Sequence, residues 1–186
     1  MHENNERNRL IDLVYRRSYR RGDFILASGA HSSFYIDARL TTMSGEGQVL
    51  IGKLGLIELD RMGWHPDLIG GLTLGADPVA YAIAHHATLE GRTLDAFTVR
   101  KEPKQHGTGR VIEGPFSGAP QVVIVEDVVT TGESALRAAK AVRNAGGIVM
   151  GLLAVVDRQE GGREKIAQEG LELAALVTLE ELNARG

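Results

Sequence analysis

The stretch VVIVEDVVTTGES, residues 122–134, joins an apolar run to two carboxylates and a turn of small polar residues. Residues 122–125 are apolar and mostly β-branched, which is typical of a strand that is buried on both faces. Glu126 and Asp127 follow this strand, and residues 130–134 lead into an alanine-rich segment. In open α/β sheets, ligands bind beyond the carboxyl ends of the strands. The stretch therefore predicts both a buried strand and a binding site at its end.

Short apolar segments recur along the chain and predict the rest of the sheet. They lie at 67–72, 94–100, 121–127 and 148–157, and their starts are about 27 residues apart. A strand and a crossover helix occupy about this length. Helical patterns lie around and between them, at 46–62, 75–89, 133–145 and 162–170. In the second of these, Asp77 and Pro78 are expected to cap the helix and to begin it. We expect an α/β fold with a central parallel sheet flanked by helices.

The first 40 residues do not follow this alternation of strands and helices. Residues 6–20 predict an amphipathic helix, and residues 24–40 predict a hairpin or a pair of irregular strands. We expect them to form a small cap, or hood, over the edge of the sheet, joined there by the C-terminal LELAALVTL, residues 171–179. The whole chain, 1–186, is interpreted as a single domain whose core spans about 65–160.

Residues 101–120, KEPKQHGTGRVIEGPFSGAP, fit neither a helix nor a strand pattern. They are rich in glycine and proline and carry Lys101, Lys104, His106 and Arg110. Loops of this length in compact domains are often lids or binding loops. We interpret the segment as a basic lid, with a solvated surface loop as the alternative.

The composition excludes several classes of protein. The chain has 186 residues, 43% of them hydrophobic, a formal net charge of -3 and no cysteine. A chain of this size can bury a sizeable core, and the absence of cysteine excludes disulfides and thiolate metal sites. No polybasic block, long apolar run or signal-peptide core is visible, so the expected protein is cytoplasmic and binds neither nucleic acid nor membrane.

The polar turn at residues 130–134 has the chemistry of a phosphate site. Backbone N–H groups, short hydroxyls and the positive end of a helix dipole all favour a bound phosphate. Glu126 and Asp127 would repel phosphate, but each can accept hydrogen bonds from the hydroxyls of a vicinal diol. Together these groups predict a ribose 5-phosphate site, with an acidic turn that only caps a helix as the alternative. The common nucleotide-binding loops, GxGxxG and GxxxxGK[ST], are not found here.

These motifs resemble those of a known family. VVIVEDVVTTGES resembles the phosphoribosyl pyrophosphate (PRPP) signature of type I phosphoribosyltransferases. FTVRKEPKQHG (97–107) resembles the flexible loop of orotate phosphoribosyltransferases, and VVDRQEGGRE (155–164) resembles the segment that carries their orotate-binding arginine. GGLTLGADPVA (70–80), the candidate pyrophosphate loop, and SSFYIDAR (32–39) also match that family. The resemblance covers nearly the whole chain.

The resemblance implies a fold, a reaction and an assembly. The fold would be that of the type I phosphoribosyltransferases, with an N-terminal hood. The reaction would be the Mg²⁺-dependent transfer of a phosphoribosyl group from PRPP to orotate, which gives orotidine 5′-monophosphate and pyrophosphate in pyrimidine biosynthesis. Mg²⁺ would be held mainly by PRPP and pyrophosphate, with no protein side chain assigned as its ligand. A homodimer that shares the lid between subunits is also implied.

The resemblance further implies roles for single residues. Orotate would contact Thr130 and Arg158, and the aromatic pair Phe34 and Tyr35 would lie near the base or else pack the cap. The expected catalytic residues are Lys104, His106 and Asp127. The expected PRPP-binding residues are Arg100, Lys101, Lys104, His106, Glu126, Asp127, Val128, Val129, Thr130, Thr131, Gly132, Glu133 and Ser134.

Two positions depart from the family pattern. Ala27 and Leu74 stand where many relatives have lysines that contact PRPP. Arg158 alone could also be a surface ion pair rather than a base contact. The alternative functions are a PRPP-binding regulator and a phosphoribosyltransferase for another base.

Overall fold

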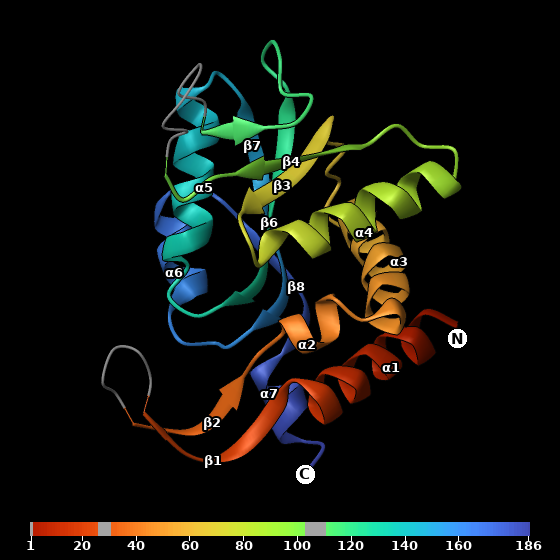
Figure 1. The fold of residues 1–186 in the computed structure, drawn as a ribbon, viewed down its shortest axis with the longest axis vertical. Helices are drawn as coiled ribbons and strands as arrows, with labels where there is room; N and C mark the ends of the chain where they lie inside the picture. Colours follow the sequence, from red (N-terminus) through yellow and green to blue (C-terminus); the bar gives the residue numbers. More distant parts are fainter. Residues whose placement is uncertain (1, 26–30, 103–110) are drawn as a thin grey trace.

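The structure is a computed structural model that describes residues 2–25, 31–102 and 111–186. Its main feature is a six-stranded sheet in the order β5-β4-β3-β6-β7-β8 (Figure 1). The strands are β3 (Leu68–Leu72), β4 (Asp95–Val99), β5 (Ile112–Glu113), β6 (Gln121–Val129), β7 (Ile148–Asp157) and β8 (Leu173–Thr178). All are parallel except β5, which pairs antiparallel with β4. The predicted α/β fold with a parallel sheet is confirmed.

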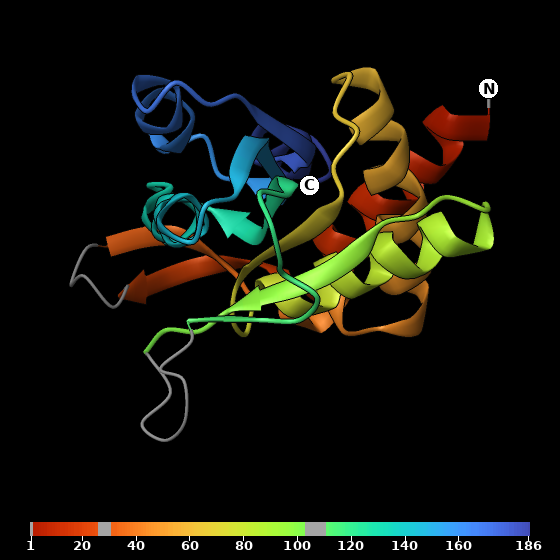
Figure 2. The ribbon, with the colours of Figure 1, turned by 90° about the horizontal axis from the view of Figure 1, so that it is seen from above.

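Helices cover both faces of this sheet. One face packs against α3 (Gly45–Arg61) and α4 (Ala76–Leu89), and the other against α5 (Glu133–Asn144) and α6 (Gly162–Gln168) (Figures 1 and 2). Alternate residues of β6 and β7 enter the two separate cores, so both faces of each strand are apolar. This arrangement explains why the strands read as continuous apolar runs rather than as alternating patterns.

The N-terminal segment lies beside the sheet and shares the hydrophobic core of one of its faces. It consists of α1 (His2–Arg17), the antiparallel pair β1 (Tyr19–Ile25) and β2 (His31–Ile36), and the short α2 (Arg39–Thr42). The last helix, α7 (Leu179–Asn183), lies against α1, where Arg7 pairs with Glu181. The predicted hairpin is confirmed, and the predicted first helix starts earlier than expected and ends before β1.

Three details of the sequence prediction are wrong. Residues 173–178 were expected in the cap but form β8, which pairs with β7 in the main sheet. The expected uninterrupted loop at 101–120 contains β5. Helix α4 begins at Ala76 with Gly75 as its N-cap, so Asp77 does not cap it. Asp77 instead accepts hydrogen bonds from the hydroxyls of Thr73 (2.6 Å) and Thr98 (2.9 Å).

Within the described ranges, no helix is long and apolar enough to cross a membrane.

Candidate active site

A cavity of about 300 Å³ lies at the carboxyl ends of β3 and β6, where the sequence places the site. Five segments meet there: the end of β2 with the start of α2, the loop between β3 and α4, the residues after β4, the end of β6, and the first turn of α5. Of the expected site residues, the cavity is lined by Tyr35, Lys101, Glu126, Asp127, Val128 and Ser134. The structure therefore brings together residues that are up to about 100 positions apart in the chain.

Glu126 is a buried carboxyl group at the end of β6, with 7% of its surface exposed. Burial, and after it the charge of Asp127, raises the pKa of Glu126 from 4.5 to about 8, while Lys101 acts in the opposite direction. Its Oε2 atom has no hydrogen-bond partner among the described residues. A buried polar atom without a partner is costly, so this oxygen is suited to accept a hydrogen bond from a ligand.

Asp127 faces the loop between β3 and α4. Its Oδ1 accepts a hydrogen bond from the backbone N–H of Val128 at 2.8 Å. A Cβ atom at Gly75 would lie only 2.6 Å from this oxygen. Glycine at position 75 therefore leaves the space that the Asp127 carboxylate occupies.

The polar turn that follows β6 begins α5 with a glycine in a left-handed conformation. Gly132 is the N-cap of α5 and has φ 78°, a backbone conformation that glycine adopts without steric cost. The turn packs against the start of α6, where a Cβ atom at Gly162 would lie 2.5 Å from the carbonyl oxygen of Thr130. The turn thus places Thr130 to Ser134 at the positive end of the α5 dipole, as a phosphate site requires.

Arg158 directly follows β7 and is buried rather than exposed at the surface. Its backbone N–H donates to the carbonyl of Val129 at 2.9 Å, which holds it beside the end of β6. The guanidinium donates to Glu160 at 2.7 Å and lies 4.8 Å from the centre of the Phe34 ring. Its Nε has no partner within the part of the chain that the structure describes. Arg158 is therefore both an ion-pair partner and an aromatic neighbour.

The two aromatic residues of the family motif have different surroundings. Phe34 stacks on Tyr19 with ring centres 5.8 Å apart, and it also lies against Arg158. Tyr35 lines the cavity and lies 5.7 Å from Phe24, ring centre to ring centre. Each residue thus packs the N-terminal hairpin, while Phe34 at the same time contacts the expected base-binding arginine.

Sequence reasoning missed a cation in the cavity. Arg39 lines it together with Asp37, and the Arg39 Nε lies 2.9 Å from Asp37 Oδ1. The hydrogen bond from Arg39 lowers the pKa of Asp37, and the charges of Asp37 and Asp127 help to raise the pKa of Arg39. Arg39 belongs to the SSFYIDAR motif, which was the only signal in the sequence. Leu74 lines the same cavity and is 53% exposed, so it supplies no charge there.

Other expected site residues do not line this cavity, among them residues 129–133 of the turn and Arg158. Arg100 lies instead beside β5, where its guanidinium is 3.4 Å from Glu113. Lys104 and His106 lie outside the described residues, as does Ala27. The described residues include no group of three or more histidine, aspartate or glutamate side chains that could hold a metal ion.

Comparisons with known proteins identify the family of this chain. Residues 50–172 match the phosphoribosyl transferase domain. The chain is 49% identical over 180 residues to the orotate phosphoribosyltransferase of Aquifex aeolicus, covering 95% of this chain and 97% of that protein.

Solved structures of Mycobacterium tuberculosis orotate phosphoribosyltransferase are similar as well. The complex with Fe(III) dicitrate has a TM-score of 0.85 and 44% identity, and the alignment covers 95% of this chain and 98% of that chain. The complex with PRPP has a TM-score of 0.81 and 41% identity, with 96% and 99% covered. The predicted type I phosphoribosyltransferase fold is confirmed. By sequence, fold and the chemistry at the end of β6, this chain belongs to the orotate phosphoribosyltransferase family.

Proposed function

We propose that this protein transfers the 5-phosphoribosyl group of PRPP to orotate, giving orotidine 5′-monophosphate and pyrophosphate. The observation that carries the proposal is the pair of carboxyl groups at the end of β6, the buried Glu126 and the half-buried Asp127, directly before the turn that begins α5. In the reaction, the bond between ribose C1 and a pyrophosphate oxygen breaks, and a bond from C1 to an orotate nitrogen forms.

The two carboxyl groups bind the ribose in this proposal. Each accepts hydrogen bonds from the 2′- and 3′-hydroxyls, and Oε2 of Glu126 is a buried acceptor ready for such a donor. As pyrophosphate leaves, positive charge develops near C1, and a nearby carboxylate stabilises it. We assign this catalytic role to Asp127, which lines the cavity and is less buried than Glu126.

The phosphate groups bind on either side of the ribose. The turn from Val128 to Ser134 holds the 5′-phosphate through its N–H groups, its hydroxyls and the helix dipole. Lys101 holds the pyrophosphate, together with Arg100, Lys104 and His106 from the basic segment. Arg39 adds a cation on the cavity wall, which offsets part of the charge lost at Leu74.

Arg158 and Thr130 bind orotate in the proposed complex. A guanidinium can engage a carboxylate through two parallel charge-assisted hydrogen bonds, and orotate carries a carboxylate that uracil lacks. The side chain is already oriented by Glu160 and by the ring of Phe34. Its orientation before substrate arrives would reduce the entropy lost on binding.

The donors at this site also suit Mg²⁺, which prefers oxygen ligands and keeps few protein ligands when it binds with phosphates. Glu126 and Asp127 are the carboxylates close to the expected ribose, and we propose that they contact the ion mainly through PRPP and its hydroxyls. When bound, Mg²⁺ would neutralise charge on the departing pyrophosphate.

We further propose a homodimer in which the basic segment of one subunit serves the site of the other. Exposed apolar side chains on neighbouring elements support a protein interface: Leu40 and Met43 at α2, Val49 on α3 and Tyr81 on α4. Apolar side chains gathered on adjoining elements often mark such surfaces.

In this proposal the chain acts as one domain, 1–186. Residues 1–40 form the hood, and residues 65–160 hold PRPP. The contacts of Phe34 with Arg158 and of Tyr35 with the site cavity support a hood that closes the base-binding side.

A spectrophotometric assay of orotate consumption with PRPP and Mg²⁺ tests the function. Parallel reactions with uracil and adenine separate the alternatives. Consumption of orotate alone supports the proposal. Consumption of adenine would indicate a transferase for another base, and PRPP binding without any reaction would indicate a regulator.

A further inference from the structure

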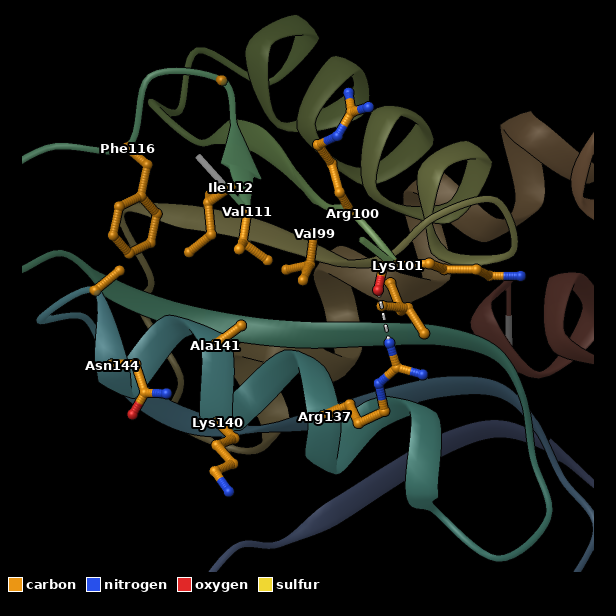
Figure 3. A pocket seen from close by; sticks show the side chains of 13 residues that line it. Val99, Arg100, Lys101, Val111, Ile112, Phe116, Arg137, Lys140, Ala141 and Asn144 are labelled. Atoms are coloured by element: carbon orange, nitrogen blue, oxygen red, sulfur yellow. Dashed lines mark hydrogen bonds between the residues drawn. The ribbon is translucent and has the colours of Figure 1, made fainter. Parts of the chain in front are cut away.

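A second and larger cavity lies on the other side of the strand ends that form the site. It has a volume of about 700 Å³ and lies between α5 and the pair β4 and β5 (Figure 3). We call it the α5 groove. Its apolar wall residues are Leu72, Val99, Val111, Ile112, Phe116 and Ala141. In Figure 3, Val99, Val111 and Ile112 point from the sheet toward α5, and Ala141 faces them from the helix.

The charged residues around the α5 groove are all cationic. Arg100, Lys101, Arg137 and Lys140 line it, and none of its described lining residues is acidic. Figure 3 shows Arg100 and Lys140 pointing away from the apolar walls, whereas Arg137 points to the end of the groove at Lys101. Arg137 donates one hydrogen bond, from Nη2 to the carbonyl of Lys101 at 3.0 Å. A guanidinium has five N–H donors, so Arg137 can also bind an anion.

We propose that the α5 groove is a binding site for a small aromatic monoanion. Its rings would lie between β5 and α5, and its anionic group would contact Arg137 at the end of the groove. The volume is in the range of small-molecule sites, which combine apolar walls with a few polar groups that fix orientation. A cationic rim without an acidic residue selects an anion over a neutral or cationic ligand.

The α5 groove is connected to the site of the proposed reaction. Lys101 and Leu72 each line both cavities. Because Arg137 already donates a hydrogen bond to the carbonyl of Lys101, an anion bound to the same guanidinium would alter the position of Lys101. This coupling rests on the proposed function, because Lys101 is there assigned to pyrophosphate. Occupation of the groove should therefore change turnover.

Binding is tested with 8-anilinonaphthalene-1-sulfonate, an aromatic monoanion whose fluorescence rises in apolar surroundings. The titration is done with saturating PRPP and Mg²⁺, which keeps the probe out of the substrate cavity. Ala141→Phe, which fills the groove, and Arg137→Gln, which removes the cation, should each weaken binding about tenfold or more. Arg143→Gln, on the same helix but outside the groove, should bind like the wild type.

The neutral analogue N-phenyl-1-naphthylamine tests the role of the charge. It should bind the wild type more weakly than the sulfonate does, and Arg137→Gln should leave its binding unchanged. Thermal unfolding of every variant shows whether it is folded, and Arg137→Gln, at an exposed position, provides the test if Ala141→Phe does not fold.

One result would overturn the site: equal probe binding, at saturating PRPP, by the wild type and both folded groove variants. The coupling is measured separately, as the effect of the probe on turnover. It should alter turnover in the wild type and in Arg143→Gln but not in Ala141→Phe, and an unchanged wild-type rate at saturating probe would overturn the coupling. Because the binding titration requires no turnover, failure of the proposed reaction would not be mistaken for failure of the site.

Discussion

Two features of its surroundings shift the pKa of Glu126 in the same direction. It lies among apolar residues at the end of a buried strand, and it is adjacent to a second carboxyl group. Both conditions disfavour its charged form, which explains why its pKa rises to about 8. Near pH 7 the ligand-free protein therefore holds a proton at Glu126, whereas the unfolded chain has released it.

This shift predicts a pH dependence of stability. Because the folded state holds the proton between pH 4.5 and about 8 and the unfolded state does not, Glu126 lowers the free energy of unfolding progressively as the pH rises through that window. Glu126→Gln removes the titration. Its stability relative to the wild type should increase from pH 5 to pH 8, measured by urea unfolding without ligands. A difference that stays constant with pH would contradict the assigned shift.

The proposed role of Arg158 predicts that its loss weakens the binding of orotate but not that of PRPP. Loss of a charge-assisted bidentate contact costs about 2 to 4 kcal/mol, so Arg158→Ala should raise the KM for orotate about thirtyfold or more. PRPP binding, measured by calorimetry, should remain nearly unchanged. Glu160→Gln, which keeps the guanidinium and an amide oxygen that can accept its hydrogen bond, is the matched control and should raise the KM far less. Equal losses for both substrates in Arg158→Ala would assign this residue to the fold instead.

At the scale of elements, the site is made by loops that approach one another closely at the carboxyl ends of the strands. The loop between β3 and α4 passes directly over Asp127, and the turn before α5 passes directly under the start of α6. Glycines at both contacts allow this approach. Because Gly75 and Gly162 have no side chain, one loop can approach the Asp127 carboxylate and the start of α6 can approach the phosphate turn.

Gly75→Ala tests this spacing. Its backbone has φ -64° and ψ -42°, which alanine adopts readily, so the added Cβ acts through its clash with Asp127. We expect turnover to fall at least tenfold, with little loss of thermal stability. Gly45→Ala, where an added Cβ meets nothing within 4 Å, is the matched control. Normal turnover of Gly75→Ala would show that the Asp127 carboxylate does not need its present position.

The elements differ in how far they could be predicted. The strands β3, β4, β6 and β7 and the helices between them follow from local patterns, because β3, β6 and β7 are apolar on both faces, β4 contains buried Phe97 and Val99, and each helix has its own period. β8 pairs with the strand that precedes it, but two of its six residues are alanines, which are weak strand formers, and the pattern of residues 171–179 does not identify it as a strand of the main sheet. Two-residue β5 is too short to carry a pattern at all.

The site, like the fold, could be predicted where its residues lie in one continuous stretch of sequence and not where they come from distant segments. Glu126, Asp127 and the turn after them form one continuous motif, and the two carboxyl groups line one cavity with Val128 and Ser134 because they lie at the end of a single strand. Arg39 enters the cavity only because the start of α2 lies beside the carboxyl ends of β3 and β6. The burial that shifts the pKa of Glu126 and the stacking of Phe34 on Arg158 likewise depend on packing between distant segments.

At the scale of the whole molecule, the proposed dimer predicts that each active site needs residues from two subunits. Lys104→Ala and Asp127→Asn subunits should each be inactive as homodimers. If Lys104 serves the neighbouring site, mixed dimers contain one site with both groups intact and should regain activity, up to about a quarter of the wild-type rate for random mixing. The measurement is turnover after subunit exchange, with light scattering to establish the dimer. Mixtures that exchange subunits but remain inactive would indicate a site completed within one chain.

The close contact between Trp64 and Gly151 has a practical consequence for all of these measurements. Trp64 is the one tryptophan of the sequence, and a Cβ at Gly151 would lie 2.1 Å from its ring. Gly151 is near the start of β7 and the site is at the far end of the strand, roughly 20 Å away for six residues of extended chain. The intrinsic fluorescence of this protein therefore comes from a single, well-buried reporter at the amino ends of the strands. Its emission should follow the opening of the sheet during unfolding and remain insensitive to the occupation of the site by substrates.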